Sequence, residues 1–255
     1  FFLENFGARH KRQASAPAKS DRAMKHTTYR GKILYLTDGK GEEGREFFTV
    51  TTQPDGARTL RAHCEMDNDE LLRDVTLTLD GAWRPIDAFV RLTIENEHQG
   101  SAWFRFSDTL LECESFTKDA GRLTQRLTTP AWPPSFGGHP VCCDTWHSKI
   151  ASLRREGDAR MQAVEWIAMS SPLPNGGSGP MLSFAHVDVE FCGLETIETP
   201  AGVFETMHVK NYNRWRGLKD PVEIWAWGDD FIPIRARWEL LGQTYELVEL
   251  DHPAR

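Results

Sequence analysis

The chain has 255 residues and 40% hydrophobic residues, enough to bury a sizeable core without disulfide bonds. Its formal net charge of −7 argues against a nucleic-acid partner, because phosphate binding needs a basic face. No run of 18 apolar residues occurs, so we predict no membrane span. The five cysteines show no CxxC spacing and form no disulfide framework, which favours the cytoplasm, with the periplasm as the alternative.

The first 26 residues are predicted to be a flexible tail. Residues 7–23 are rich in Ala, Ser, Lys and Arg and offer little to bury. The beginning of the chain also lacks the apolar stretch of a secretory signal. We therefore predict a single domain over residues 27–255.

From residue 27 to residue 129, short strand-like segments alternate with turn residues. Asn, Asp, Gly and Pro mark the turns, because they tolerate positive φ or preset a bend. Strands at this spacing, with almost no helical periodicity, indicate an antiparallel meander. The predicted strands cover residues 28–37, 45–53, 57–66, 70–80, 84–98, 101–108, 109–117 and 122–129.

Residues 130–158 interrupt this alternation. Four prolines and two glycines exclude regular structure before Val141. After it, apolar residues at 146, 150 and 153 are spaced by four and three, which predicts one short helix near residues 141–155.

Six further strands follow the helix. They are predicted at residues 161–171, 181–197, 202–213, 222–228, 232–240 and 243–250. A total of about 13–14 antiparallel strands is too many for a flat sheet, because strongly twisted sheets of more than about ten strands curl, split or close. We predict a mainly all-β fold, an up-and-down barrel or half-barrel with the helix plugging one side.

The C-terminal portion, about 60 residues long, resembles the end of an uncharacterised bacterial β-barrel domain family of unknown function. That family is similar to the curved sheets of lipoprotein-carrier and lipocalin-like proteins, which hold hydrophobic molecules in their concavity. The resemblance implies a concave sheet, carries over no catalytic residue, and points to a family whose members are usually exported. It rests on the turn and packing residues Thr199, Pro200, Gly202, Phe204, Trp225, Asp229, Asp230 and Pro233.

The stretch PVEIWAWGDDFIPIRARWEL, residues 221–240, places Trp225 and Trp227 on one face of a strand. If the hairpin loop is Gly228 to Phe231, Trp227 pairs with Ile232 and Trp225 with Ile234. The tryptophan face then continues into Trp238 as an apolar wall. Turn preference favours this four-residue loop.

The alternative loop is the three residues Gly228 to Asp230. It pairs Glu223 with Arg235 and makes the tryptophan face mixed and charged, since one residue of register moves every side chain to the other face.

Nine tryptophans are spread over many segments, and they either fill the core or line a cavity. The side chains that we predict to bind a ligand are Trp103, Trp146, Trp225, Trp227 and His63.

The segment FAHVDVEF places His186, Asp188 and Glu190 on one face of a strand and apolar residues on the other. A solvent-facing surface has the same pattern. His208 has the same polar parity on the next strand and could approach His186 if the strands pair. A His–Asp pair beside a second His would serve as a general acid/base, so His186, Asp188 and His208 are the predicted catalytic residues.

The segment HPVCCDTWH offers His139, Cys142, Cys143, Asp144 and His147. Cys143 and His147 share a helix face, and a thiolate at a helix N-terminus beside a His would be activated. A helical plug with buried thiols is the simpler interpretation. Since no metal-binding or phosphate-loop spacing occurs, we predict neither a metal nor a cofactor.

The predicted function is therefore the binding of a small hydrophobic or aromatic molecule in a Trp-lined cavity. The alternative is a cofactor-independent lyase, isomerase or hydratase that uses His/Asp acid/base groups in the same cavity, so whether the protein is an enzyme stays open. A third interpretation is an envelope or assembly protein that offers a curved sheet to a partner. The sequence indicates no oligomeric state.

Overall fold

The structure is a computed structural model that describes residues 25–152, 159–214 and 220–252. Its first half is a meander of eight strands whose side chains alternate between a buried face and an exposed face, as half-buried strands require. The strands are β1 (Thr27–Thr37), β2 (Gly41–Thr52), β3 (Arg58–Met66), β4 (Leu71–Leu79), β5 (Pro85–Ile94), β6 (Glu97–Phe106), β7 (Leu110–Thr117) and β8 (Gly121–Thr128).

The boundary between β5 and β6 differs from the predicted one. We expected a strand to His98 and a turn at Gly100, but the hairpin turns at Glu95 and Asn96, whose φ angles are 52° and 60°. A two-residue turn with positive φ at both positions matches the twist of a hairpin. Gly100 lies inside β6 instead, where a Cβ atom would come within 2.8 Å of the Phe116 carbonyl oxygen.

The second half adds seven strands, of which the two-residue β9 was not predicted. Its buried Phe136 packs on Phe104 and Phe106 of β6, and backbone hydrogen bonds of 3.2 and 2.9 Å pair this Pro-rich segment with β10. The expectation of no regular structure before Val141 is therefore wrong. The strands are β9 (Phe136–Gly137), β10 (Met161–Met169), β11 (Ser183–Thr199), β12 (Gly202–Asn213), β13 (Val222–Trp227), β14 (Ile232–Trp238) and β15 (Gln243–Asp251).

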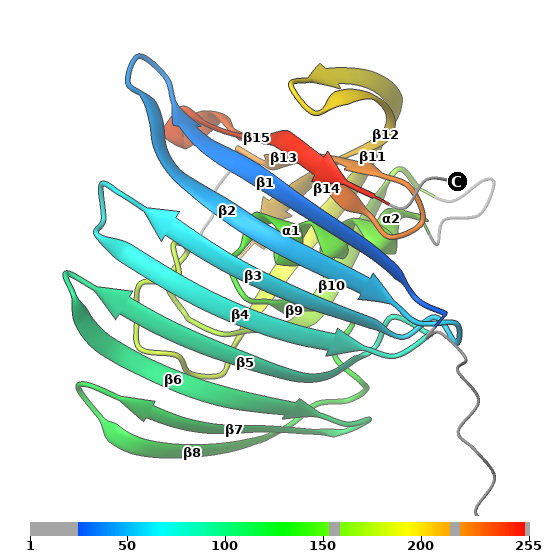
Figure 1. Cartoon of the computed structure of the whole chain (residues 1–255). Helices are drawn as coiled ribbons and strands as arrows, with labels where there is room; N and C mark the ends of the chain where they lie inside the picture. Colours follow the sequence, from blue (N-terminus) through cyan, green and yellow to red (C-terminus); the bar gives the residue numbers. More distant parts are fainter. Residues whose placement is uncertain (1–24, 153–158, 215–219, 253–255) are drawn as a thin grey trace, which may run out of the picture.

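All fifteen of these strands form one sheet, in the order β8-β7-β6-β5-β4-β3-β2-β1-β15-β14-β13-β12-β11-β10-β9. The last strand joins the halves by pairing with the first, so that Tyr245 lies opposite Tyr35. Every neighbouring pair is antiparallel except β9 and β10. Figure 1 shows this sheet curling around an interior segment of the chain. The predicted all-β, antiparallel and strongly curved architecture is thereby confirmed.

A short helical segment occupies the inside of the curve (Figure 1). It consists of α1 (Val141–Thr145), the 3-10 turn η1 (Trp146–Ser148) and α2 (Lys149–Ser152), and a further 3-10 turn, η3 (Glu239–Leu241), follows β14. The predicted helix therefore exists. Its expected last residues, 153–155, and nearly all of the predicted tail lie outside the described residues.

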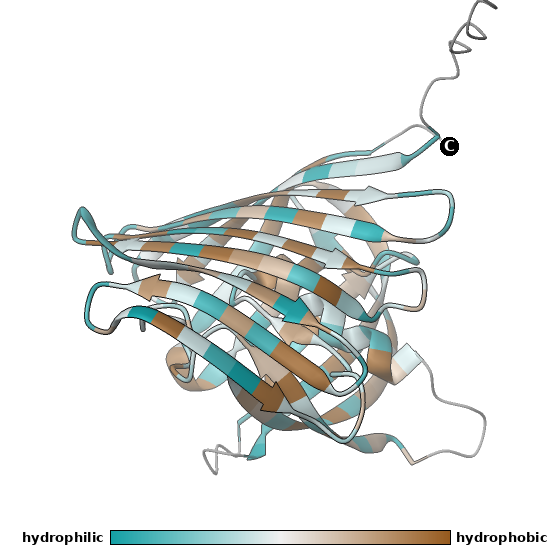
Figure 2. Ribbon diagram, turned by 90° about the horizontal axis from the view of Figure 1, so that it is seen from below, coloured by the Kyte–Doolittle hydropathy of each residue, from teal (hydrophilic) through white to brown (hydrophobic). Residues whose placement is uncertain are grey.

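Two apolar clusters surround this helical segment. The larger lies between the helical segment and the inner faces of β1–β7, extends to β10 and β12–β15, and includes Trp146, Phe104 and Phe136. The smaller lies between α2 and the inner faces of β10–β14 and includes Ile167 and Val209. Figure 2 shows hydrophobic and hydrophilic residues alternating along the strands, as expected when one face of the sheet is buried.

Two observations bear on the compartment and the membrane. None of the helices among the described residues is long and apolar enough to cross a bilayer. All five cysteines are free thiols, and four of them are buried.

Candidate functional site

A cavity with two lobes lies beside the helical segment: the first lobe faces the second half of the sheet, and the second lobe also reaches β1, β3 and β4. The first lobe has a volume of about 160 Å³ and the second a volume of about 310 Å³. The lobes adjoin, because six residues line both of them: His139, Asp144, Pro174, Val222, Ile224 and Trp238.

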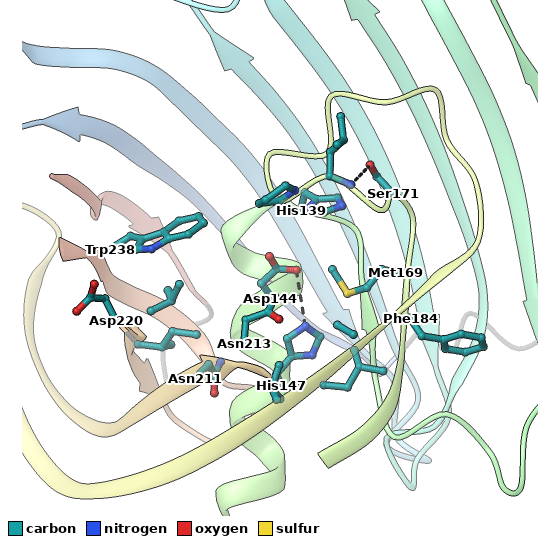
Figure 3. A pocket seen from close by; sticks show the side chains of 17 residues that line it. His139, Asp144, His147, Met169, Ser171, Phe184, Asn211, Asn213, Asp220 and Trp238 are labelled. Atoms are coloured by element: carbon teal, nitrogen blue, oxygen red, sulfur yellow. Dashed lines mark hydrogen bonds and ion pairs between the residues drawn. The ribbon is translucent and has the colours of Figure 1, made fainter. Parts of the chain in front are cut away.

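The first lobe is mainly apolar. Its walls come from β10, β11 and β13 and from the loop after β10, and they are Ile167, Met169, Leu173, Phe184, Ala185, Val187, Val222 and Ile224. Figure 3 shows Trp238 on one side of this lobe and Met169 and Phe184 on the other. A mostly apolar hollow with a few polar groups is typical of small-molecule sites.

The helical segment supplies the polar edge. His139 precedes α1 with a φ of 75°, a left-handed conformation that costs about 1 kcal/mol or more in a non-glycine residue. Gly176 packs against it so closely that a Cβ atom there would lie 2.6 Å from the His139 ring and 2.7 Å from the Arg73 guanidinium. The backbone of two loops thus fixes where these two side chains point.

Three titratable groups of this edge have pKa values displaced from the ordinary ones: His147 is buried, and His139 and Asp144 are partly buried. Burial lowers the pKa of His139 to about 3, with a further contribution from the charge of Arg73. Burial also lowers the pKa of His147 to about 4. Burial, followed by the charge of Glu46, raises the pKa of Asp144 to about 7. At pH values between about 4 and 7 both imidazoles are therefore neutral and Asp144 carries its proton.

His147 lies between two potential proton partners. Its Nδ1 is 2.6 Å from the Oγ of Ser135, and its Nε2 is 3.8 Å from the Oδ1 of Asp144 (Figure 3). The second distance is too long for a direct hydrogen bond.

Four buried polar atoms on residues that line the first lobe have no hydrogen-bond partner within the described parts of the chain. Buried polar groups are nearly always paired, so each such atom needs an explanation. The four are His139 Nε2, Asp144 Oδ1, Asn211 Oδ1 and Trp238 Nε1. Their gathering around one hollow indicates that polar atoms of a ligand or of water belong there.

Glu46 anchors the helical segment to the sheet. Its fully buried carboxylate accepts hydrogen bonds from the Tyr35 hydroxyl at 2.7 Å and from the backbone N–H groups of Val141 and Cys142 at 2.7 and 3.0 Å. These N–H groups begin α1 and have no partner within the helix. One side chain from β2 therefore fixes the position of the segment that carries His139, Asp144 and His147.

The cysteines beside Glu46 are inert in this environment. Burial raises the pKa of the Cys142 and Cys143 thiols well above the ordinary value. The Cys143 thiol accepts from the Gly138 N–H at 3.2 Å and donates to the Phe136 carbonyl at 3.4 Å. The geometry therefore matches the helical plug with buried thiols and not an activated Cys143–His147 pair.

Three of the predicted ligand-binding residues lie away from the two lobes. Trp103 is 42% exposed on the face of β6 opposite the core. His63 lies on the corresponding face of β3, where its Nδ1 is 2.8 Å from the Asp74 carboxylate. Trp146 is buried in the larger apolar cluster and donates its indole N–H to the Asp230 carbonyl at 3.0 Å.

The hairpin with Trp225 and Trp227 has the favoured loop but only part of the expected register. Its loop is Gly228 to Phe231 and Trp227 lies opposite Ile232, yet a β-bulge between Trp225 and Ala226 places Trp225 opposite Arg235. Trp225 then donates its N–H to Glu195 at 2.7 Å, and Trp227 packs edge-on against Phe204. The expected apolar wall running into Trp238 does not form.

The predicted catalytic residues are not brought together. The Val187 and Val189 side chains are buried, so the alternate residues His186 and Asp188 lie on the outer face, where they pair with Glu165 and Arg214, respectively. Although β11 and β12 do pair, His208 lies opposite Gly193.

His208 is instead enclosed on the outer face of the sheet. Its ring lies 3.1 Å from Glu195 and 2.8 Å from Glu223 and stacks on Trp225 with a centroid separation of 4.3 Å. None of His186, Asp188 and His208 lines either lobe.

Two residues that shape the site were missed in the sequence. Arg73 shares the parity of Leu71, Val75 and Leu77 in its strand, and Glu46 shares that of Phe48 and Val50. A charged residue on the apolar side of an alternating strand must point into the protein. This parity signal was available and would have found both.

No group of three or more His, Cys, Asp or Glu side chains in the described part of the chain is arranged to hold a metal ion.

No family model matches the chain and no curated protein matches its sequence. Among solved structures, it is similar to a β-barrel-like protein of the domain of unknown function DUF1849 from Brucella abortus, with a TM-score of 0.55, 12% identity, and coverage of 91% of this chain and 99% of that chain. A candidate lipoprotein from Parabacteroides distasonis has a TM-score of 0.31 and 11% identity over 88% of this chain and 95% of that chain. A candidate exported protein with a YmcC-like fold from Bacteroides fragilis has a TM-score of 0.26 and 10% identity over 90% of this chain and 96% of that chain.

The likeness to the Brucella abortus protein is one of fold, and it spans nearly the whole chain. The expectation that the resemblance is confined to the last 60 or so residues is therefore wrong. The kind of family that was expected, an uncharacterised bacterial β-barrel domain, agrees with it.

Proposed function

We propose that the protein binds a small hydrophobic or aromatic molecule in the two-lobed cavity. The observation that supports this most strongly is that the first lobe has apolar walls and is lined by residues with four polar atoms that have no partner within residues 25–152, 159–214 and 220–252. An apolar cavity alone could stay dry, and a polar one could simply hold water. Walls of Ile167, Phe184 and Ile224 facing Asp144 and Trp238 suit a molecule with an apolar body and a polar group.

The size of the cavity is consistent with this proposal. Ligand pockets for small molecules generally have volumes of roughly 300–1,000 Å³. The second lobe alone, at about 310 Å³, reaches the lower end of this range, and the first lobe continues it. The expected ligand is therefore a single small molecule and not a large lipid with several chains.

The test is a titration of the purified chain with a panel of alkyl and aryl compounds, followed by tryptophan fluorescence and calorimetry. Trp238 lines both lobes, so an occupant will change its emission. The variant Trp238→Phe should lose most of this change, whereas Trp103→Phe should keep it. Binding of no compound at millimolar concentration would reject the proposal.

A second candidate, an acid/base catalyst, is favoured by one observation. Asp144 and His147 lie 3.8 Å apart, and burial moves their pKa values in opposite directions, to about 7 and about 4. Such a pair can divide the roles of proton donor and proton acceptor near neutral pH. The reaction class would be a lyase or isomerase that acts on a bound carbonyl compound, with Asp144 and His147 in the roles first predicted for His186, Asp188 and His208.

Catalysis can be tested without knowing the natural substrate. Ketones that bind the cavity should exchange their α-protons for deuterium in D₂O faster with the native chain than with Asp144→Asn or His147→Ala. Equal rates for all three proteins would leave the binding proposal as the only function.

The cellular compartment stays a prediction made from the five cysteines, with the cytoplasm and the periplasm as its two alternatives.

A further inference from the structure

Arg73 is a buried arginine whose guanidinium has few partners. It lies on the inner face of β4 and is 3% exposed. Its one hydrogen bond within the described residues goes from a terminal nitrogen to the Asn175 carbonyl at 2.5 Å, and it takes part in none of the ion pairs found there. A guanidinium carries five N–H donors and stays charged at every accessible pH.

The partnerless side of this arginine belongs to the cavity. Arg73 lines the second lobe together with Trp238, whose indole N–H also has no partner among the residues that the structure describes. Burying an unpaired charge costs several kcal/mol, so a protein that keeps one needs an acceptor for it. The planar fork of the guanidinium fits a carboxylate, which can accept two parallel N–H bonds.

The acidic groups around the lobe do not remove this need. The Glu46 carboxylate is engaged by Tyr35 and by the first N–H groups of α1. Asp144 lines both lobes, and burial raises its pKa to about 7, so that it is largely neutral below that pH. Asp69 lines the second lobe as an exposed residue, and its charge faces solvent.

We infer that the ligand is a monocarboxylic acid with an apolar body, whose carboxylate binds Arg73 and the Trp238 N–H in the second lobe while its body fills the first lobe. This inference rests on the proposed binding function and narrows it to one chemical class. The apolar walls of the first lobe, Ile167, Phe184 and Ile224, hold an aryl group or a medium-length alkyl chain.

The arrangement also explains the fixed geometry around the arginine. Gly176 lies in contact with both Arg73 and His139, and the loop that contains it closes over the guanidinium through the Asn175 carbonyl. The Arg73 guanidinium is thus held in a single orientation before a ligand enters. Such preorganisation reduces the cost of binding.

The experiment compares decanoic acid with 1-decanol, and 4-phenylbutyric acid with 4-phenylbutanol, by calorimetry at pH 6.3, where Asp144 is largely neutral and both ligand acids are ionised. We expect each acid to bind the native chain at least tenfold more tightly than its alcohol. The variant Arg73→Met keeps the length of the apolar stem and should abolish the preference while leaving the affinity for the alcohol within threefold. Arg91→Met, on the outer face of β5, is the matched control and should change neither affinity.

Two further arms keep the outcome decisive. If Arg73→Met fails to give a cooperative thermal transition, Trp238→Phe removes one N–H and should reduce the preference by about three- to tenfold. Equal affinities of acid and alcohol for the native chain would overturn the inference and leave the binding proposal intact. Binding of neither acid nor alcohol would overturn both.

Discussion

The Oδ1 atom of Asp144 lies 3.8 Å from the Nε2 atom of His147, and both side chains belong to the helical segment inside the curved sheet. Because burial raises the pKa of the acid to about 7 and lowers that of the imidazole to about 4, both groups are uncharged over most of the range between. Asp144 and His147 thus bring no charge to the cavity in this pH range, whereas Arg73 gives its second lobe a positive charge.

The variant Asp144→Asn should become more stable relative to the native chain as the pH rises. A carboxyl whose folded pKa of about 7 exceeds its unfolded value of 3.8 binds extra protons when folded, so its favourable contribution is complete below about pH 4 and is lost as the pH rises through 7. The amide has no such dependence. Urea unfolding at pH 5 and pH 8 should show that the free energy of unfolding of the variant rises relative to that of the native chain at the higher pH, by an amount that solvent screening reduces because the Asp144 side chain is 37% exposed.

Asp108→Asn provides the control, because Asp108 is exposed in the turn between β6 and β7. The free energy of unfolding of Asp108→Asn should differ from that of the native chain by the same amount at both pH values. If the difference in the free energy of unfolding between Asp144→Asn and the native chain is also the same at pH 5 and pH 8, Asp144 ionises in the folded protein as it does in water.

Glu46→Gln should detach the helical segment. The substitution removes the charge that accepts the Val141 and Cys142 N–H groups and places an N–H₂ group among donors. Hydrogen bonds to a charged group are worth about 1.5–3 kcal/mol, so urea unfolding should show a loss of about 2–3 kcal/mol or more. Glu42→Gln, in an exposed pair with Arg45, should cost less than about 1 kcal/mol. Equal losses would mean that Glu46 does not anchor α1.

Gly176→Ala should weaken ligand binding as well as stability. The added methyl group meets the His139 ring at 2.6 Å and Arg73 at 2.7 Å, and the residue has a φ of +66°. Gly121→Ala is a matched control, since Gly121 has a φ of +63° but nothing within 4 Å of its Cβ position. Both variants should lose roughly 1 kcal/mol of stability, because alanine disfavours the positive φ of these positions. Only Gly176→Ala should lower the affinity for a ligand, by tenfold or more in calorimetry.

The lack of a role for His208 in ligand binding is equally testable. His208 is held between Glu195 and Glu223 on the outer face of the sheet, so His208→Ala should lower the thermal midpoint of unfolding by several degrees. The affinity for any cavity ligand should stay within twofold of the native value. A large loss of affinity at unchanged stability would place His208 at the cavity, where the sequence analysis predicted it as a catalytic residue.

The curved sheet could be predicted from the sequence because turn chemistry and side-chain alternation act locally. Strands such as β12, predicted as residues 202–213 and observed as Gly202–Asn213, are bounded by glycine or by polar runs. The turn at Glu95 and Asn96 was missed because neither residue is a glycine, although both adopt positive φ. Strand β9 is only two residues long and depends on an aromatic contact with a distant strand, so the sequence around it shows no strand pattern.

The site was harder to predict because it depends on register and on parity between distant strands. The bulge beside Trp225 shifts one strand by a single residue, and no residue type marks it. Arg73 and His139 come together only because the sheet curls and the loop around Gly176 closes on both. The segment from His139 to His147 was noticed for its chemistry, but its partners could not be deduced from spacing.

The place where a small apolar molecule binds to the protein is the most direct test of a ligand site inside the curved sheet. Methyl-labelled NMR spectra of the chain with and without decanoic acid would locate it. We predict the largest shift changes at Ile167, Val187 and Ile224, which line the first lobe, and almost none at Leu72 and Ile86, which are exposed on the outer face. Changes confined to Leu72 and Ile86 would contradict the account, because the ligand would then bind the outside of the sheet and not its hollow.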